Sequence, residues 1–212
     1  PLRLVGSEMC IRDSPEILEI IKEPGDGYTF GSVWHTDQMF NPKPAKATML
    51  YAHEVPSKGG DTMFSNQYLA YEALSQAMKE ILTDVKTFNV GDGFRRGIGK
   101  AKRMDRYAKN PTMRAKIRNP GTVPTEAVHP LIRTHPETRK KSLYIGSHTQ
   151  TLHGFDDKEA DSLVDFLRAH SQRQEFTCRF RWEPGSIALW DNRCVQHLSL
   201  IHISEPTRRR GI

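Results

Sequence analysis

The feature that most constrains this chain is a histidine and an aspartate one residue apart, His35 and Asp37, in the segment WHTD. On an extended backbone, side chains at positions i and i+2 point to the same face. An imidazole nitrogen and a carboxylate oxygen are therefore neighbours there and can bind one metal ion. A second histidine would complete a set that binds iron(II) on one face and leaves the other face open for O2 and a co-substrate.

The pair alone is also compatible with a surface turn that carries polar side chains and no metal. Two further segments narrow the choice. Near the other end of the sequence, an apolar stretch runs into the polar turn WDNR and then reaches His197. Between the two histidines, the segment GGDT contains Thr62.

In this order and spacing, the segments resemble the taurine catabolism dioxygenase (TauD/TfdA) family of iron(II)- and 2-oxoglutarate-dependent oxygenases. The matching segments are VWHTD, VPSKGGDTMFSN, YLAYEALS, HPLIRTHPETRKKSLYIG and ALWDNRCVQH, which together cover roughly residues 28–197. The resemblance implies that His35, Asp37 and His197 are the iron ligands and the catalytic centre.

The resemblance also implies that 2-oxoglutarate chelates the metal while its far carboxylate is held by Thr62 and by an arginine beyond His197. A hydroxyl and a guanidinium suit a carboxylate well. Arg208 lies eleven residues after His197, which matches the family's interval, and Arg209 is a neighbouring alternative.

The other seven histidines are expected to be ordinary surface or core residues, since a single histidine seldom marks a metal site. They are His53, His129, His135, His148, His153, His170 and His202. Two tryptophans close to the ligands in sequence, Trp34 and Trp190, either line the pocket or pack in the core.

Short apolar or alternating stretches separated by glycine and proline predict a mainly β fold with flanking helices. Strands are expected at residues 15–22, 47–55, 62–64, 123–133, 142–146, 176–182 and 187–190. One helix is expected to start at Ser65 or Asn66 and run through the apolar positions of 69–81, and a second to start at Asp156 with Glu159. The resemblance implies a double-stranded β-helix (jelly roll, cupin-like) that is incomplete at both ends.

Residues 15–197 are expected to form the oxygenase core. Residues 1–14 and 198–212 do not resemble the family, so we expect the first segment to be non-native or disordered and treat the second as a suspect tail, although it contains Arg208.

The positive charge of the chain is concentrated in a basic, lid-like loop at about residues 92–120. The net charge is +6, and residues 94–118 contain ten lysines and arginines against one acid, Asp105. Such a loop can be a solvated surface segment, or a lid that attracts an anionic substrate. A nucleic-acid patch is a third alternative, but few aromatic residues interleave with the charges.

The three cysteines have unrelated spacings, and neither a signal peptide nor a membrane-length apolar run is visible. We therefore expect a cytoplasmic protein with no nucleic-acid or membrane partner; a homo-oligomer is possible. The expected activity uses Fe(2+), 2-oxoglutarate and O2 to hydroxylate a small anionic substrate, with release of succinate and CO2. Taurine or another sulfonate, an alkyl sulfate and an aryloxy-carboxylate are the substrate types considered. The alternative is a non-catalytic jelly-roll remnant or binding module.

Overall fold

The computed structural model describes residues 2–7, 17–22, 31–57, 59–91 and 125–200, and these residues form a mainly β structure with a few helices, as predicted. The strands are β1 (Leu2–Ser7), β2 (Ile17–Lys22), β3 (Ala47–Glu54), β4 (Thr62–Asn66), β5 (Lys86–Val90), β6 (Glu126–Pro130), β7 (Ile132–Thr134), β8 (Lys141–Leu143), β9 (Thr149–Leu152), β10 (Thr177–Phe180), β11 (Ile187–Asp191) and β12 (Val195–Ser199). The helices are α1 (Gln67–Glu72), α2 (Gln76–Leu82), α5 (Asp157–Ser171) and the 3-10 turn η1 (Gln174–Phe176).

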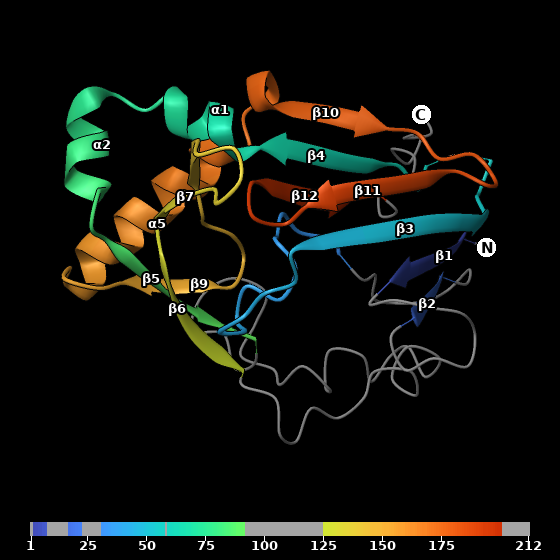
Figure 1. Cartoon of the computed structure of the whole chain (residues 1–212), viewed down its shortest axis with the longest axis horizontal. Coiled ribbons are helices and arrows are strands. Elements are labelled where there is room, and N and C mark those ends of the chain that lie inside the picture. The colour runs from blue at the N-terminus through green and yellow to red at the C-terminus, as the bar shows by residue number, and fades with distance from the viewer. Residues whose placement is uncertain (1, 8–16, 23–30, 58, 92–124, 201–212) are drawn as a thin grey trace, which may run out of the picture.

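Two antiparallel sheets form one half of the molecule (Figure 1). One has the strand order β11-β3-β1-β2, and the other has the order β10-β4-β12. An apolar cluster that includes Leu50, Ala52 and Trp190 from the first sheet packs against Phe64 and Phe180 from the second. The sheets are therefore held together by a shared core.

Alternation along β3 and β11 explains this packing. Leu50 and Ala188 are opposite each other in the register and are buried. Their neighbours form the exposed cross-strand pairs Tyr51–Ile187 and Met49–Leu189 on the outer face. A period of two residues thus separates the core face from the outer face.

The helices lie at the other end of the molecule, beside β5, β6 and β9 (Figure 1). Their core includes Leu82 from α2 and Val164 and Leu167 from α5. Helix α5 begins with the predicted capping box, because Asp156 accepts the Glu159 backbone N–H while the Glu159 side chain accepts the Asp156 N–H. This reciprocal pairing satisfies two backbone donors that a helix start leaves unpaired.

The single helix predicted across residues 65–81 is wrong. Asn66 caps α1 as expected, but α1 ends at Glu72, and Ser75 starts α2 by accepting the Met78 N–H. A serine side chain that bonds to nearby backbone competes with helix continuation. Of the predicted apolar positions, Leu74 and Met78 do face the helical core, whereas Leu69 and Ile81 are exposed.

The predicted strand at 123–133 is also divided, into β6 and β7. Leu131 lies between them, and its N–H donates to the Val85 carbonyl rather than continuing one ladder. Leu2–Ser7 lies within the segment predicted to be non-native or disordered, yet it forms β1 between β2 and β3. The non-native origin of that segment stays a prediction.

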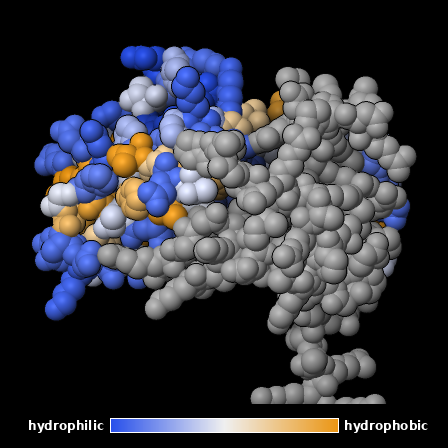
Figure 2. Space-filling view, turned by 90° about the horizontal axis from the view of Figure 1, so that it is seen from below, coloured by the Kyte–Doolittle hydropathy of each residue, from blue (hydrophilic) through white to orange (hydrophobic). Residues whose placement is uncertain are grey.

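The surface seen in Figure 2 mixes hydrophilic residues with smaller apolar patches wherever the chain is described. Exposed large apolar side chains in this part of the chain include Ile81, Val128 and Phe166. In the described segments, no helix combines the length and apolar character needed to cross a bilayer.

The α5 core should contribute strongly to stability. Leu167→Ala removes a side chain with 0% exposure and should lower the free energy of unfolding by about 2–5 kcal/mol. Ile81→Ala is the control, because Ile81 is 56% exposed and its loss should change stability by no more than about 0.5 kcal/mol. Urea denaturation measures both; equal losses would contradict the assigned core.

Candidate metal centre

His35 and His197 are joined through their backbones, although they are far apart in sequence. The His35 N–H donates to the His197 carbonyl at 3.1 Å, and the His197 N–H donates to the His35 carbonyl at 2.9 Å. The Thr36 hydroxyl adds a bond to the Val195 carbonyl at 3.0 Å. The segment that carries His35 therefore lies along β12, which carries His197.

Gly31 makes room for this arrangement. Its φ is +75°, and a Cβ placed there would lie 3.4 Å from Cε1 of His35. Its carbonyl accepts the Ser199 N–H at 2.9 Å, so the backbone is held close to β12. Glycine suits this left-handed conformation beside a side chain that needs the space.

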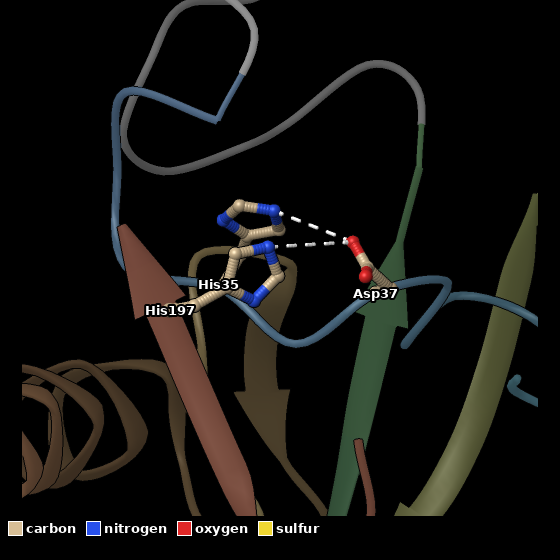
Figure 3. Close-up of side chains that lie close together, drawn as sticks. All are labelled: His35, Asp37 and His197. Carbon is tan, nitrogen blue, oxygen red and sulfur yellow. Dashed lines mark ion pairs between the residues drawn. The ribbon is translucent and has the colours of Figure 1, made fainter. Parts of the chain in front are cut away.

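Asp37 completes a cluster with the two histidines (Figure 3). Its Oδ1 lies 3.5 Å from Nε2 of His35 and 3.8 Å from Nε2 of His197. One candidate ligand atom from each residue falls within 4.8 Å of the others. The structure thus brings together the three residues that the sequence singles out.

The hydrogen bonding of His35 leaves the correct nitrogen available for a metal. Its Nδ1 lies 2.7 Å from the Val33 carbonyl, which can only accept, so Nδ1 carries the hydrogen. In the neutral ring, Nε2 then presents a lone pair toward the Asp37 carboxylate. Two electron-rich atoms facing each other favour a cation between them, either a proton or a metal ion.

Burial and charge set the protonation of the cluster. Burial lowers the pKa of His197 to about 3, with a further contribution from the charge of His35. Burial would also lower the pKa of His35, but its hydrogen bond and charge interaction with Asp37 prevail and raise it. Burial opposes ionisation of Asp37, yet the two histidines keep its pKa well below the usual range. A neutral His197 and an ionised Asp37 are the forms that bind metals.

The second histidine ring is enclosed by aromatic side chains. Trp190 lies 4.6 Å from the His197 ring and Phe64 lies 6.3 Å away, both measured between ring centroids. The Nδ1 of His197 is buried without a hydrogen-bond partner. Metal binding through Nε2 would put the hydrogen on Nδ1, beside these rings. The donor set and its burial therefore fit a metal ion, and Trp190 both packs in the core and borders the site.

Thr62 lies on the same face of its sheet as His197. The register pairs Phe64 with His197 and Thr62 with Ser199. Thr62 is therefore a diagonal neighbour of His197 on the adjacent strand, about 7–8 Å away. The Trp182 indole donates to its Oγ1 at 3.0 Å, which leaves the Thr62 hydroxyl hydrogen free to donate elsewhere.

Several predicted features lie outside the described residues. These are Arg208, its alternative Arg209, His202 and the whole basic loop predicted at about 92–120. Of the other histidines, His129, His135 and His170 are buried. His129 and His170 each place Nε2 against a backbone carbonyl, of Asn41 and Ala70 respectively, as expected of core histidines.

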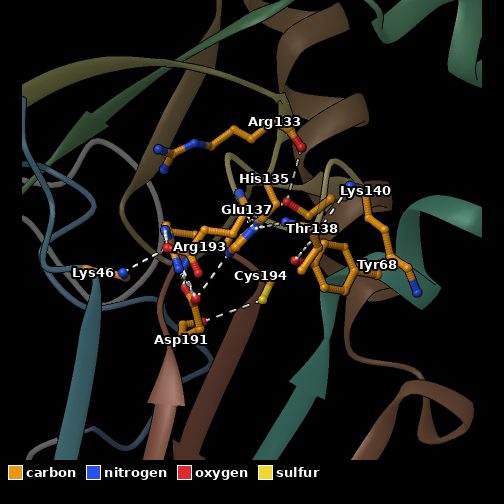
Figure 4. A network of polar contacts seen from close by, with 11 residues as sticks. Lys46, Tyr68, Arg133, His135, Glu137, Thr138, Lys140, Asp191, Arg193 and Cys194 are labelled. Carbon is orange, nitrogen blue, oxygen red and sulfur yellow. Dashed lines mark hydrogen bonds and ion pairs between the residues drawn. The ribbon is translucent and has the colours of Figure 1, made fainter.

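His135 belongs to a second group that could hold a metal, with Asp191 and Cys194 (Figure 4). Its Nδ1 accepts the backbone N–H groups of Glu137 and Thr138 at 3.2 and 3.1 Å. That nitrogen carries no hydrogen, so Nε2 carries it and donates to Asp191 at 3.1 Å. Neither nitrogen then offers a free lone pair, which argues against a metal here.

Asp191 instead anchors an ion-pair network. Burial would raise its pKa, but hydrogen bonds from Arg193 and His135 outweigh burial and lower it to about 2. Arg193 also contacts Glu137, which pairs with Lys46 at 2.8 Å. The network fixes the turn between β11 and β12, directly before the strand that carries His197.

Sequence reasoning did not single out Thr48, which contacts the cluster. Thr48, at the start of β3, donates from Oγ1 to Oδ2 of Asp37 at 2.6 Å. A threonine in a strand is ordinary, so no local pattern marks it.

A sequence model of the "Taurine catabolism dioxygenase TauD, TfdA family" matches residues 11–210. The chain belongs to this family. The match confirms the resemblance carried by the WHTD, GGDT and WDNR segments.

Relatives in the family include an alpha-ketoglutarate-dependent sulfate ester dioxygenase from Pseudomonas putida, 31% identical over 79% of this chain and 54% of the relative. An alpha-ketoglutarate-dependent 2,4-dichlorophenoxyacetate dioxygenase from Cupriavidus pinatubonensis is 32% identical over 91% of this chain and 60% of the relative. The crystal structure of a taurine dioxygenase from Burkholderia xenovorans matches with a TM-score of 0.65 and 27% identity, over 95% of this chain and 58% of the other. The chain thus spans little more than half the length of these relatives.

Metal binding should distinguish the two clusters. Titration of the metal-free chain with Fe(II) under anaerobic conditions should show one tight site. His197→Ala removes a direct ligand and should weaken binding by more than the roughly 100-fold loss that an outer partner can cause. Cys194→Ser, in the second cluster, is the control and should leave the affinity unchanged. The reverse pattern would assign the metal to the second cluster.

Proposed function

We propose that this chain is the core of an iron(II)- and 2-oxoglutarate-dependent dioxygenase that hydroxylates a small anionic substrate and releases succinate and CO2. The observation that carries the proposal is the convergence of His35, Asp37 and His197. Family membership supports the cofactor assignment, since relatives are named alpha-ketoglutarate-dependent dioxygenases.

The chain's own residues have distinct roles in this proposal. His35, Asp37 and His197 hold iron(II) on one face. The bound ion would supply the redox chemistry that activates O2. Thr62 donates its free hydroxyl hydrogen to the far carboxylate of 2-oxoglutarate, and Arg208 is proposed as the guanidinium partner. The aromatic rings of Trp190 and Phe64 exclude water beside His197.

We further propose that the two packed sheets are part of a double-stranded β-helix. Packed antiparallel sheets let rigid strands bring distant ligands to one place. The printed names of the relatives, a sulfate ester and a chlorophenoxyacetate dioxygenase, favour an anionic substrate for this chain as well. The positive charge of residues 94–118, a segment outside the described residues, would favour such a substrate.

The direct test is spectroscopic. Under anaerobic conditions, the chain with Fe(II) and 2-oxoglutarate should show a weak visible charge-transfer band, because the co-substrate chelates the ion. His35→Ala should abolish the band. Addition of O2 with a panel of sulfonates, alkyl sulfates and aryloxy-carboxylates should then yield succinate. A band without succinate for any substrate would favour the non-catalytic alternative, and no band at all would overturn the proposal.

Substitution of Thr62 should lower the affinity for 2-oxoglutarate and leave the affinity for Fe(II) unchanged. Thr62→Val removes one charge-assisted hydrogen bond and should weaken 2-oxoglutarate binding by about tenfold or more, because such bonds contribute about 1.5–3 kcal/mol. Iron affinity should stay unchanged. The control is Thr177→Val, at a strand position where the hydroxyl donates only to the Gln174 carbonyl. Titration of the charge-transfer band measures both variants; unchanged 2-oxoglutarate affinity in Thr62→Val would remove Thr62 from the site.

A further inference from the structure

The two carboxylate oxygens of Asp37 have different surroundings. Oδ1 faces the Nε2 atoms of His35 and His197. Oδ2 accepts a hydrogen bond from the Thr48 hydroxyl at 2.6 Å. The carboxylate is therefore held in one orientation, with a single oxygen toward the histidines.

Thr48 is the last residue in a series of side-chain hydrogen bonds. The side-chain amide of Asn192 lies 2.8 Å from Oγ1 of Thr48. The Trp190 indole nitrogen lies 3.0 Å from Oδ1 of Asn192. Asn192 and Trp190 are 1% and 6% exposed, so water competes little for these bonds.

The first donor in this series of hydrogen bonds determines the direction of the others. An indole N–H can only donate, so Oδ1 of Asn192 must accept. The amide of Asn192 is then oriented with its NH2 group toward Thr48, whose oxygen accepts. The Thr48 hydroxyl hydrogen is left with one direction, toward Oδ2 of Asp37. This series of hydrogen bonds therefore directs the Thr48 hydroxyl to Oδ2 of Asp37 and leaves Oδ1 for the metal.

We infer that Trp190, Asn192 and Thr48 form a relay that positions Asp37 for metal binding. The inference rests on the metal site of the proposed function and names three positioning residues for it. The relay also reaches the second histidine, since the Trp190 ring lies 4.6 Å from that of His197. One set of side chains thus orients two of the three ligands.

The strands give the relay a rigid support. Thr48 on β3 and Trp190 on β11 are direct cross-strand partners. The backbone N–H of Asn192 donates to the Lys46 carbonyl at 3.0 Å, which ties the turn after β11 to the start of β3. Relative movement of Thr48 and Asn192 would break sheet hydrogen bonds, so the donor is held in place before any metal arrives.

Thr48→Val tests the last link. Valine keeps the branched shape and removes the hydroxyl, so Asp37 loses its donor and the buried Asn192 amide loses its acceptor. Fe(II) affinity, measured anaerobically by calorimetry, should fall by about 10–100-fold. Thr48→Ser restores the hydroxyl, so its Fe(II) affinity should stay within about threefold of that of the unsubstituted chain. Thr177→Val, the matched control, should not change affinity.

A double-mutant cycle tests whether the three residues act together. Trp190→Phe keeps an aromatic ring beside His197 but removes the N–H that orients Asn192. Thr48→Val already breaks the relay, so adding Trp190→Phe should cause little further loss. The Fe(II) affinity of the double variant should be close to that of whichever single variant binds Fe(II) more weakly. Losses that simply multiply would overturn the relay, as would an unchanged affinity in Thr48→Val.

Two outcomes separate the relay from the proposed function. If the unsubstituted chain binds no Fe(II), the metal site itself fails. If it binds Fe(II) and Thr48→Val binds equally well while folded, only the relay fails. Thermal unfolding of each metal-free variant identifies any variant that does not fold. If Thr48→Val does not fold, the other two single variants decide. The relay is contradicted if Thr48→Ser loses Fe(II) affinity, or if Trp190→Phe keeps the affinity of the unsubstituted chain.

Discussion

The reciprocal backbone hydrogen bonds between His35 and His197 are the contact on which the site depends. They join a segment near one end of the sequence to β12 near the other, and they do so without using either imidazole. Both rings are therefore left for chemistry while the main chain fixes their separation. Asp37 lies in the turn that follows His35, and one of its carboxylate oxygens falls within 4.8 Å of a nitrogen of each histidine.

Three further sets of interactions hold the residues around this contact in place. Gly31 provides the space for the His35 ring, the Asp191–Arg193 network fixes the turn before β12, and the relay through Thr48 orients the carboxylate. The relay residues are buried or lie on strands, so their geometry is set by folding. A site of this kind is prepared by the fold and does not have to be organised by its ligand.

The family, the mainly β class and the candidate trio of His35, Asp37 and His197 could be predicted from sequence, because each has a local signature. β3 and β11 alternate, and WHTD and WDNR are compact motifs. β5, β9 and β12 were missed, because their buried faces carry polar residues. Asn89 and Gln196 are 0% exposed and are paired with other buried polar side chains, Thr87 and Gln67 respectively. Thr48 was missed because its role exists only once β3 and β11 are paired.

The prepared geometry of the three candidate ligands would have a cost in selectivity. A pocket that needs no rearrangement to accept an ion cannot reject the wrong one through the energy of rearrangement. Divalent copper and zinc bind nitrogen and oxygen ligands more tightly than ferrous iron does, following the Irving–Williams order. Correct loading would then depend on which ions surround the chain, and a preparation exposed to traces of zinc would hold an inert occupant in place of a reactive one.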